Sequence, residues 1–205
     1  MSSGRSGSTL SRGVKKEKLL TVLEQVVDDL AQTEAVRYER GLTELGKALG
    51  ANAFKPMKDG RCDSAWLWDP ALWLTIEAKS EEGAARSIPL KHIRQTNTQL
   101  SLLANDQEVD VPPPASCSII VSARATIEPG DAAAANPNVY LTSPDDVSSL
   151  AADIRGAWSR LLAIGASAGA DPAAQRTQVT EVLKDFGCLP TQVVERLTSV
   201  PVRPY

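Results

Sequence analysis

Two carboxylates and a lysine lie near the ends of two neighbouring segments that are each predicted to be a β-strand. Asp63 belongs to the segment 61–68, and Glu77 and Lys79 close the segment 72–79. Like charges that face each other on paired strands repel, unless a cation lies between them. Magnesium takes oxygen ligands and is commonly held by one or two carboxylates together with a substrate phosphate. A lysine beside such a site could orient the attacking water or neutralise the phosphorus centre, so these residue types suit phosphodiester hydrolysis.

The hydrophobic pattern selects how the two strands pair. In an antiparallel pair, directly opposed residues point to the same face of the sheet. A three-residue connection places Trp68 opposite Leu72, which makes one face almost wholly apolar and sets Asp63 opposite Glu77 on the other face. A two-residue turn would mix charge with apolar residues on both faces. We therefore predict the register that pairs the two carboxylates, with Lys79 on their face.

Apolar periodicity and turn residues predict the elements around this pair. The segment after Ser143 has the clearest start, because serine is a good N-cap and Pro144 suits the first helical position. The first predicted helix has its apolar stripe at 19–30 and begins with the lysines at 15, 16 and 18. The other predicted elements are a helix at 35–49, strands at 51–55, 61–68 and 72–79, a helix at 89–104, strands at 117–123 and 138–142, a helix from 144 to about 162, a helix ending at Gly187 and a helical turn at 191–197.

Asp63 followed by Glu77-Ala78-Lys79 at the end of the next strand resembles the PD-(D/E)XK, or restriction-endonuclease-like, nuclease superfamily. Cys62 stands where that family usually has proline. The resemblance extends to Glu39 on the helix before the three strands and to Gln95 on the helix after them. It covers about 35–123 and is greatest for nuclease domains associated with helicases or bacterial defence systems.

The resemblance implies a role for each of these residues. Asp63, Glu77, the carbonyl of Ala78 and Glu39 would bind Mg²⁺, for which Mn²⁺ would substitute. Lys79 would act on the attacking water, and Gln95 would orient Lys79 or a water. The weaker candidates nearby on their helices are Glu44, Asn97 and Gln99.

The resemblance also implies an α/β fold, in which a restriction-endonuclease-like core has a mixed central sheet flanked by helices. We expect a flexible leader at 1–13, rich in Ser, Gly and Arg, and a nuclease-like domain at 14–165. A helical C-terminal extension is expected at 166–205.

DNA, the expected partner, requires local positive charge, because 25 acidic residues against 22 lysines and arginines give the chain no general basic field. The segment 84–100 carries Arg86, Lys91 and Arg94 without an acidic residue, and Arg124 could add to this strip. A solvated helix face explains three such charges equally well.

Composition narrows the remaining classes. No stretch approaches the roughly 18 apolar residues of a membrane span. The cysteines at 62, 117 and 188 lack the spacing of a disulfide framework or a zinc site, which favours a reducing, cytoplasmic setting. The single histidine, His92, excludes two-histidine metal motifs and is interpreted as an exposed or DNA-facing helix residue. Trp66 and Trp68 are expected in the core, whereas Trp73 could be a core residue or a base-stacking platform.

These observations predict a magnesium-dependent DNA endonuclease. The alternative is a catalytically inactive nuclease-fold module that binds DNA or docks a partner, such as a helicase or another defence-complex subunit. A third interpretation is an unrelated interaction domain, which would be favoured if Asp63 and Glu77 lay on opposite faces of the sheet. A homodimer is left open.

Overall fold

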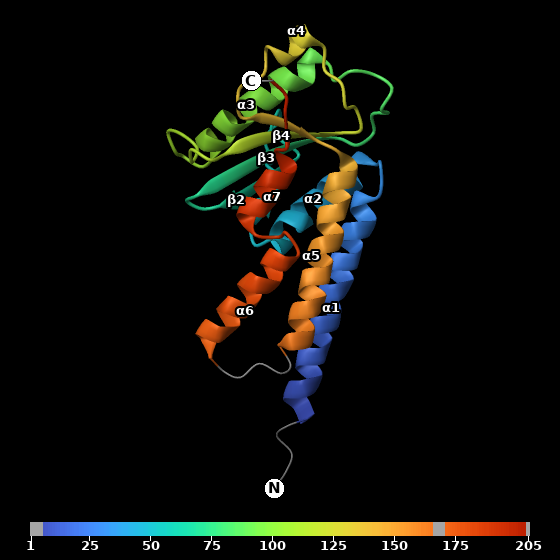
Figure 1. Cartoon of the computed structure of the whole chain (residues 1–205), viewed down its shortest axis with the longest axis vertical. Helices are drawn as coiled ribbons and strands as arrows, with labels where there is room; N and C mark the ends of the chain where they lie inside the picture. The colour runs from blue at the N-terminus through green and yellow to red at the C-terminus, as the bar shows by residue number, and fades with distance from the viewer. Residues whose placement is uncertain (1–5, 166–170, 204–205) are drawn as a thin grey trace.

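In the computed structural model, which describes residues 6–165 and 171–203, a six-stranded sheet has helices on both faces (Figure 1). The strands follow chain order across the sheet, β1-β2-β3-β4-β5-β6. The strands are β1 (Asn52–Phe54), β2 (Ser64–Trp68), β3 (Leu72–Lys79), β4 (Cys117–Ser122), β5 (Val139–Thr142) and β6 (Val200–Pro201). The helices are α1 (Ser6–Leu30), α2 (Ala35–Ala48), α3 (Leu90–Asp106), α4 (Pro129–Ala132), α5 (Pro144–Ile164), α6 (Pro172–Asp185) and α7 (Pro190–Leu197).

The sheet is mixed, as predicted. β1, β2 and β3 form an antiparallel meander, β4 and β5 run parallel to β3, and β6 is antiparallel to β5. Helix α3 forms the crossover between the parallel strands β3 and β4, which a parallel connection requires. A helix, three antiparallel strands, a crossover helix and a parallel strand agree with the core that the resemblance implies. The α/β class with a mixed central sheet flanked by helices is confirmed.

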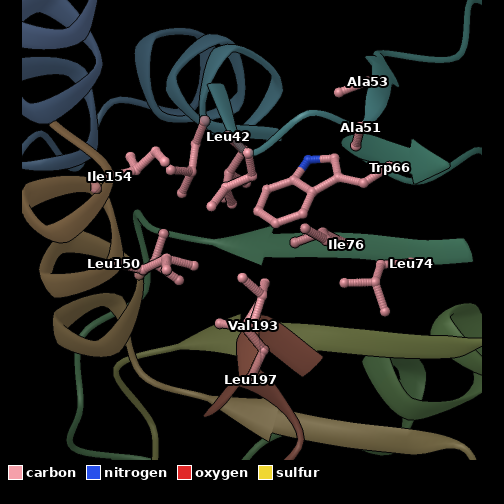
Figure 2. Packing of buried hydrophobic residues seen from close by; sticks show 14 of the residues in the cluster. Leu42, Ala51, Ala53, Trp66, Leu74, Ile76, Leu150, Ile154, Val193 and Leu197 are labelled. Atoms are coloured by element: carbon pink, nitrogen blue, oxygen red, sulfur yellow. The ribbon is translucent and has the colours of Figure 1, made fainter. Parts of the chain in front are cut away.

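The predicted register between β2 and β3 is also confirmed. Trp68 pairs with Leu72, Trp66 with Leu74 and Ser64 with Ile76. One face of the sheet carries the main core. Figure 2 shows Trp66 lying among Leu42 of α2 and Ile76 of β3, and Trp66 has no exposed surface.

The opposite face of the meander is not open to solvent. α3 covers it, and Leu100 and Leu103 of α3 pack against Leu67 and Trp73. Trp73 is only 4% exposed, so of its two interpretations the structure supports the core residue. The carboxylates therefore emerge from a sheet that is buried on both sides.

Local signals account for the ends of the principal helices. Gly50 follows α2 with φ +83°, a conformation that favours glycine. Ser143 caps α5 as predicted, because its side chain accepts a hydrogen bond from the backbone N–H of Asp146 while the Asp146 side chain reaches back to the Ser143 N–H.

Two differences from the sequence prediction concern the first helix and the start of β2. Helix α1 starts at Ser6, so residues 6–13 are helical and not a flexible leader, because extending a formed helix costs far less than nucleating one. Residues 1–5 and 166–170 lie outside the described residues. β2 starts at Ser64 and not at 61, since only that part of the segment pairs with β1 and β3.

The C-terminal segment contributes to the main core and to the sheet. Val193 and Leu197 of α7 are buried in the main core, and the short strand β6, which the sequence did not predict, pairs with β5. In the described part of the chain, no helix has the length and apolar character needed to cross a bilayer.

Candidate active site

Asp63 and Glu77 lie together at one end of the meander. The β2–β3 pairing ends with Ser64 opposite Ile76, and Asp63, the residue before Ser64, lies in a bend close enough to Glu77 for the charge of Glu77 to act on its carboxylate. The Asp63 N–H donates to the Ile76 carbonyl at 3.0 Å, and Asp63 Oδ2 accepts from the Ala78 N–H at 2.7 Å. These two backbone contacts fix the Asp63 carboxylate against the end of β3.

Glu77 is almost completely buried, with 3% of its surface exposed. Its Oε1 accepts from Lys79 Nζ at 2.6 Å and from Gln95 Nε2 at 2.7 Å. Its Oε2 is buried and has no hydrogen-bond partner among the described residues. A buried carboxylate oxygen without a donor is energetically costly, and a bound cation would satisfy it.

The pKa values of both carboxyl groups are raised, as burial and nearby negative charge require. Burial raises the pKa of Asp63 to about 7, and the charge of Glu77 acts in the same direction. The pKa of Glu77 is also raised by burial, against the opposing hydrogen bond and charge of Lys79. Both carboxyl groups are therefore protonated more easily than isolated ones, and a bound divalent cation would favour their charged forms.

Glu39 reaches the site from α2 and forms an ion pair with Lys55, just after β1. Its charge raises the pKa of both Asp63 and Glu77, which places the Glu39 carboxylate near them. Sequence reasoning missed Lys55. The signal that could have found it is the β1–β2 register: Phe54 pairs with Ala65, so Lys55 falls beside the residues that lead into β2.

The residues present fit a hard divalent cation. Asp63 and Glu77 offer two carboxylates, and Glu77 Oε2 is the unsatisfied oxygen. Among the residues described, no three side chains of the His, Cys, Asp and Glu types converge to form a complete site by themselves. Magnesium commonly keeps waters and substrate oxygens in its coordination sphere, so two protein carboxylates suffice.

Gln95 is brought to the site from α3, whereas the three weaker candidates are engaged elsewhere. Glu44 pairs with Lys47 at 2.7 Å. The Asn97 side chain bonds the backbone of Ala134 and Asn136, and the Gln99 side chain donates to the Gly60 carbonyl. Each of these hydrogen bonds ties a loop or a helix in place.

The segment before Asp63 is fixed by α3. Asp106, near the end of α3, accepts from Arg61 Nε at 2.6 Å and from Lys58 Nζ at 2.6 Å. Together with the Gln99 bond to Gly60, these contacts anchor the loop that delivers Asp63. Sequence reasoning did not identify this anchor, since its partners lie more than forty positions apart.

The interpretation of His92 as an exposed residue is wrong. His92 is 5% exposed, its Nε2 lies 3.5 Å from Glu82 Oε1, and burial lowers its pKa. The cause is the fold of the loop after β3, which brings Glu82 back over α3. Arg124 also contacts Glu82, at 3.3 Å, and donates to the Ser87 carbonyl, so it holds this loop.

Arg86, Lys91 and Arg94 are all exposed. They lie on the loop and first turns of α3, the helix that also provides Gln95. The basic strip is therefore connected to the candidate site by a single helix.

No family model and no curated protein matches the sequence. Among solved structures, the restriction endonuclease FokI is similar at 12% sequence identity and a TM-score of 0.43. The match covers 68% of this chain and 27% of the FokI chain.

Proposed function

We propose that this chain is a metal-dependent DNA endonuclease that hydrolyses phosphodiester bonds. The observation that carries the proposal is the state of Glu77: one oxygen is held by Lys79 and Gln95, and the other is buried without a hydrogen-bond partner among the described residues. A like-charged buried pair is unfavourable as a purely structural feature. It is favourable where a cation and a phosphate bind.

Asp63, Glu77, the carbonyl of Ala78 and Glu39 would hold the metal, which we propose to be Mg²⁺ with Mn²⁺ as a substitute. When bound, the ion would supply Lewis-acid stabilisation of the phosphoryl charge and favour ionisation of a water. The protein's own groups then act on the substrate. Lys79, held by Glu77, orients the attacking water and neutralises charge at phosphorus.

Gln95 acts through its neighbour. Its side-chain amide donates to Glu77 Oε1 at 2.7 Å, which keeps the carboxylate in one orientation. Water attacks phosphorus in line with the leaving oxygen, the attacking water loses a proton to solvent, and the leaving oxygen takes a proton from solvent. No covalent intermediate is required, because water, and not a side chain, is the group that attacks phosphorus.

The basic strip of Arg86, Lys91 and Arg94 is proposed to contact the DNA backbone. All three side chains are exposed and follow the loop that leaves the site. Each phosphate that a lysine or arginine neutralises adds to affinity and to its salt dependence.

The test is cleavage of supercoiled plasmid and of labelled single- and double-stranded oligonucleotides, in Mg²⁺, Mn²⁺ or EDTA. Wild type is compared with Asp63→Asn and Lys79→Met, and Asp59→Asn serves as a matched control because its side chain is exposed. We expect cleavage that requires metal, is lost in the first two variants and is kept in the control. Metal-independent cleavage, or equal cleavage by all four proteins, would assign the activity to a contaminant. DNA binding without cleavage in any metal would favour the inactive binding module.

A further inference from the structure

A cavity of about 800 Å³ opens at the carboxyl ends of the parallel strands, next to the candidate active site. Its walls come from the end of α1, the first turn of α2, the loop after β3 and the start of α5. This volume is in the range of sites that bind small organic groups.

The topology explains why a crevice forms at this edge. The helix that follows β3, α3, covers one face of the sheet, whereas the helix that follows β5, α5, covers the other (Figure 1). The connections after these strands therefore diverge. In open α/β sheets, ligands bind in the crevice that such divergence leaves outside the carboxyl ends of the strands.

A buried hydroxyl at this cavity has no partner. Tyr38 is 1% exposed and lines the cavity, and its hydroxyl oxygen makes no hydrogen bond to any described residue. Asp145 also lines the cavity.

The charge of the lining selects the chemistry of an occupant. Three carboxylates, Glu81, Glu82 and Asp145, line the cavity, and none of its described lining residues is a lysine, arginine or histidine. Glu81 accepts from the Ala35 N–H and Glu82 contacts Arg124, which leaves Asp145 as an acceptor that forms no ion pair with any described residue. Such a lining disfavours a phosphate and favours a group that presents N–H donors.

The cavity adjoins the candidate active site through two pairs of consecutive residues. Tyr38 lines the cavity and Glu39 belongs to the active site, and Lys79 belongs to the active site while Ser80 lines the cavity. Consecutive Cα atoms are about 3.8 Å apart. A nucleic acid strand with a phosphodiester at Lys79 would therefore have a neighbouring nucleoside within reach of the cavity.

We propose that this cavity binds the base of a nucleotide next to the phosphodiester held at the active site. Asp145 accepts a hydrogen bond from the exocyclic amino group of the base, and the Tyr38 hydroxyl makes a second hydrogen bond. The base must leave its stack to enter, which an unpaired base does at least cost. The assignment of the strand rests on the proposed nuclease function, whereas binding of the base does not.

The first experiment measures binding of the free deoxynucleosides by ligand-observed NMR, which needs no catalytic activity. We expect deoxyadenosine, deoxycytidine or deoxyguanosine to bind at least threefold more tightly than thymidine, which lacks an exocyclic amino group. Tyr38→Phe and Asp145→Asn should each weaken that binding about three- to tenfold, the effect of one hydrogen bond. Asp110→Asn, an exposed residue before β4 at the opposite edge, should leave it unchanged.

Thermal unfolding of the same variants separates ligand binding from folding. Tyr38→Phe removes a hydroxyl that has no protein partner, so its melting temperature should equal or exceed that of wild type. A marked loss of stability would mean that the hydroxyl has a structural role and would overturn the inference. Equal affinity for thymidine, binding of spermidine but of no nucleoside, or nucleoside binding unchanged in both variants would also overturn it.

A cleavage assay distinguishes the two proposals. If the chain cleaves DNA, substituting abasic sites one at a time around the cleaved bond should lower the rate at one position for wild type and not for Tyr38→Phe. If no such position exists while cleavage proceeds, the cavity proposal fails and the nuclease stands. If nucleosides bind at Tyr38 but no DNA is cleaved, the nuclease proposal fails and the base site stands.

Discussion

Replacing Asp63 by asparagine should stabilise the metal-free protein at alkaline pH. The change keeps the size of the side chain and an oxygen that can accept from the Ala78 N–H, but removes a negative charge beside Glu77. The pKa of Asp63 rises from an ordinary 3.8 to about 7, first because of burial and then because of the Glu77 charge.

The sign of the effect follows from proton binding. Between pH 3.8 and about 7 the folded chain keeps a proton on Asp63 that the unfolded chain has lost, so raising the pH favours unfolding. A shift of about three pKa units corresponds to about 4 kcal/mol above pH 7. We expect the variant to recover about 2 to 4 kcal/mol, because the asparagine amide still pays part of the cost of burial.

The assay is urea unfolding in EDTA at several values between pH 4 and 8.5. The variant should be as stable as wild type near pH 4 and more stable by about 2 to 4 kcal/mol at pH 8.5, or roughly 5 to 15 °C in melting temperature for a chain of this size. Magnesium should then stabilise wild type and not the variant, since only wild type retains both carboxylates. A stability difference that does not change with pH would refute the raised pKa of Asp63 in the folded chain.

Three further substitutions test other parts of the site and fold. Lys79→Met should lower the rate of cleavage about 10²- to 10⁴-fold, which kinetics measures. It should also lower the free energy of unfolding by about 3 kcal/mol at pH 8, which urea unfolding measures, because it leaves the Glu77 carboxylate buried without its counter-ion. Lys55→Gln should raise Mg²⁺ affinity about two- to fivefold in calorimetry, since Glu39 loses its competing cation; a fall in affinity would contradict this. Gly46→Ala should lower stability by about 1 to 2 kcal/mol in thermal unfolding, because the added methyl would lie 2.6 Å from a fully buried indole; an unchanged or higher stability would contradict that clash.

The pairing of the carboxylates could be predicted from the sequence because side chains alternate along a strand. A shift of one residue would put Asp63 on the face of Ile76 and mix charge with the apolar row of Trp66, Leu74 and Ile76, so the hydrophobic pattern favours one register. That register places Asp63 opposite Glu77 without any knowledge of the rest of the chain. The start of α5 was predictable for a similar reason, since its cap depends on a few consecutive residues.

Other features depended on contacts between residues far apart in the sequence. His92 has no local signal for burial, and only the fold of the loop after β3 places Glu82 and Arg124 against it. The sequence could not show which polar faces of α3 are exposed and which are covered. Apolar periodicity identifies the side of a helix that faces the core, but it does not show which loops pack over the other sides.

The sequence alone predicted most of the elements and the β2–β3 register, because these follow from local periodicity and from the pleat of paired strands. Only the tertiary structure decided that Gln95 reaches Glu77, that Lys55 pairs with Glu39 and that Tyr38 is left without a partner beside a cavity. The physical reason is that the approach of helices to a sheet is set by the packing of the whole core, to which residues throughout the chain contribute at once.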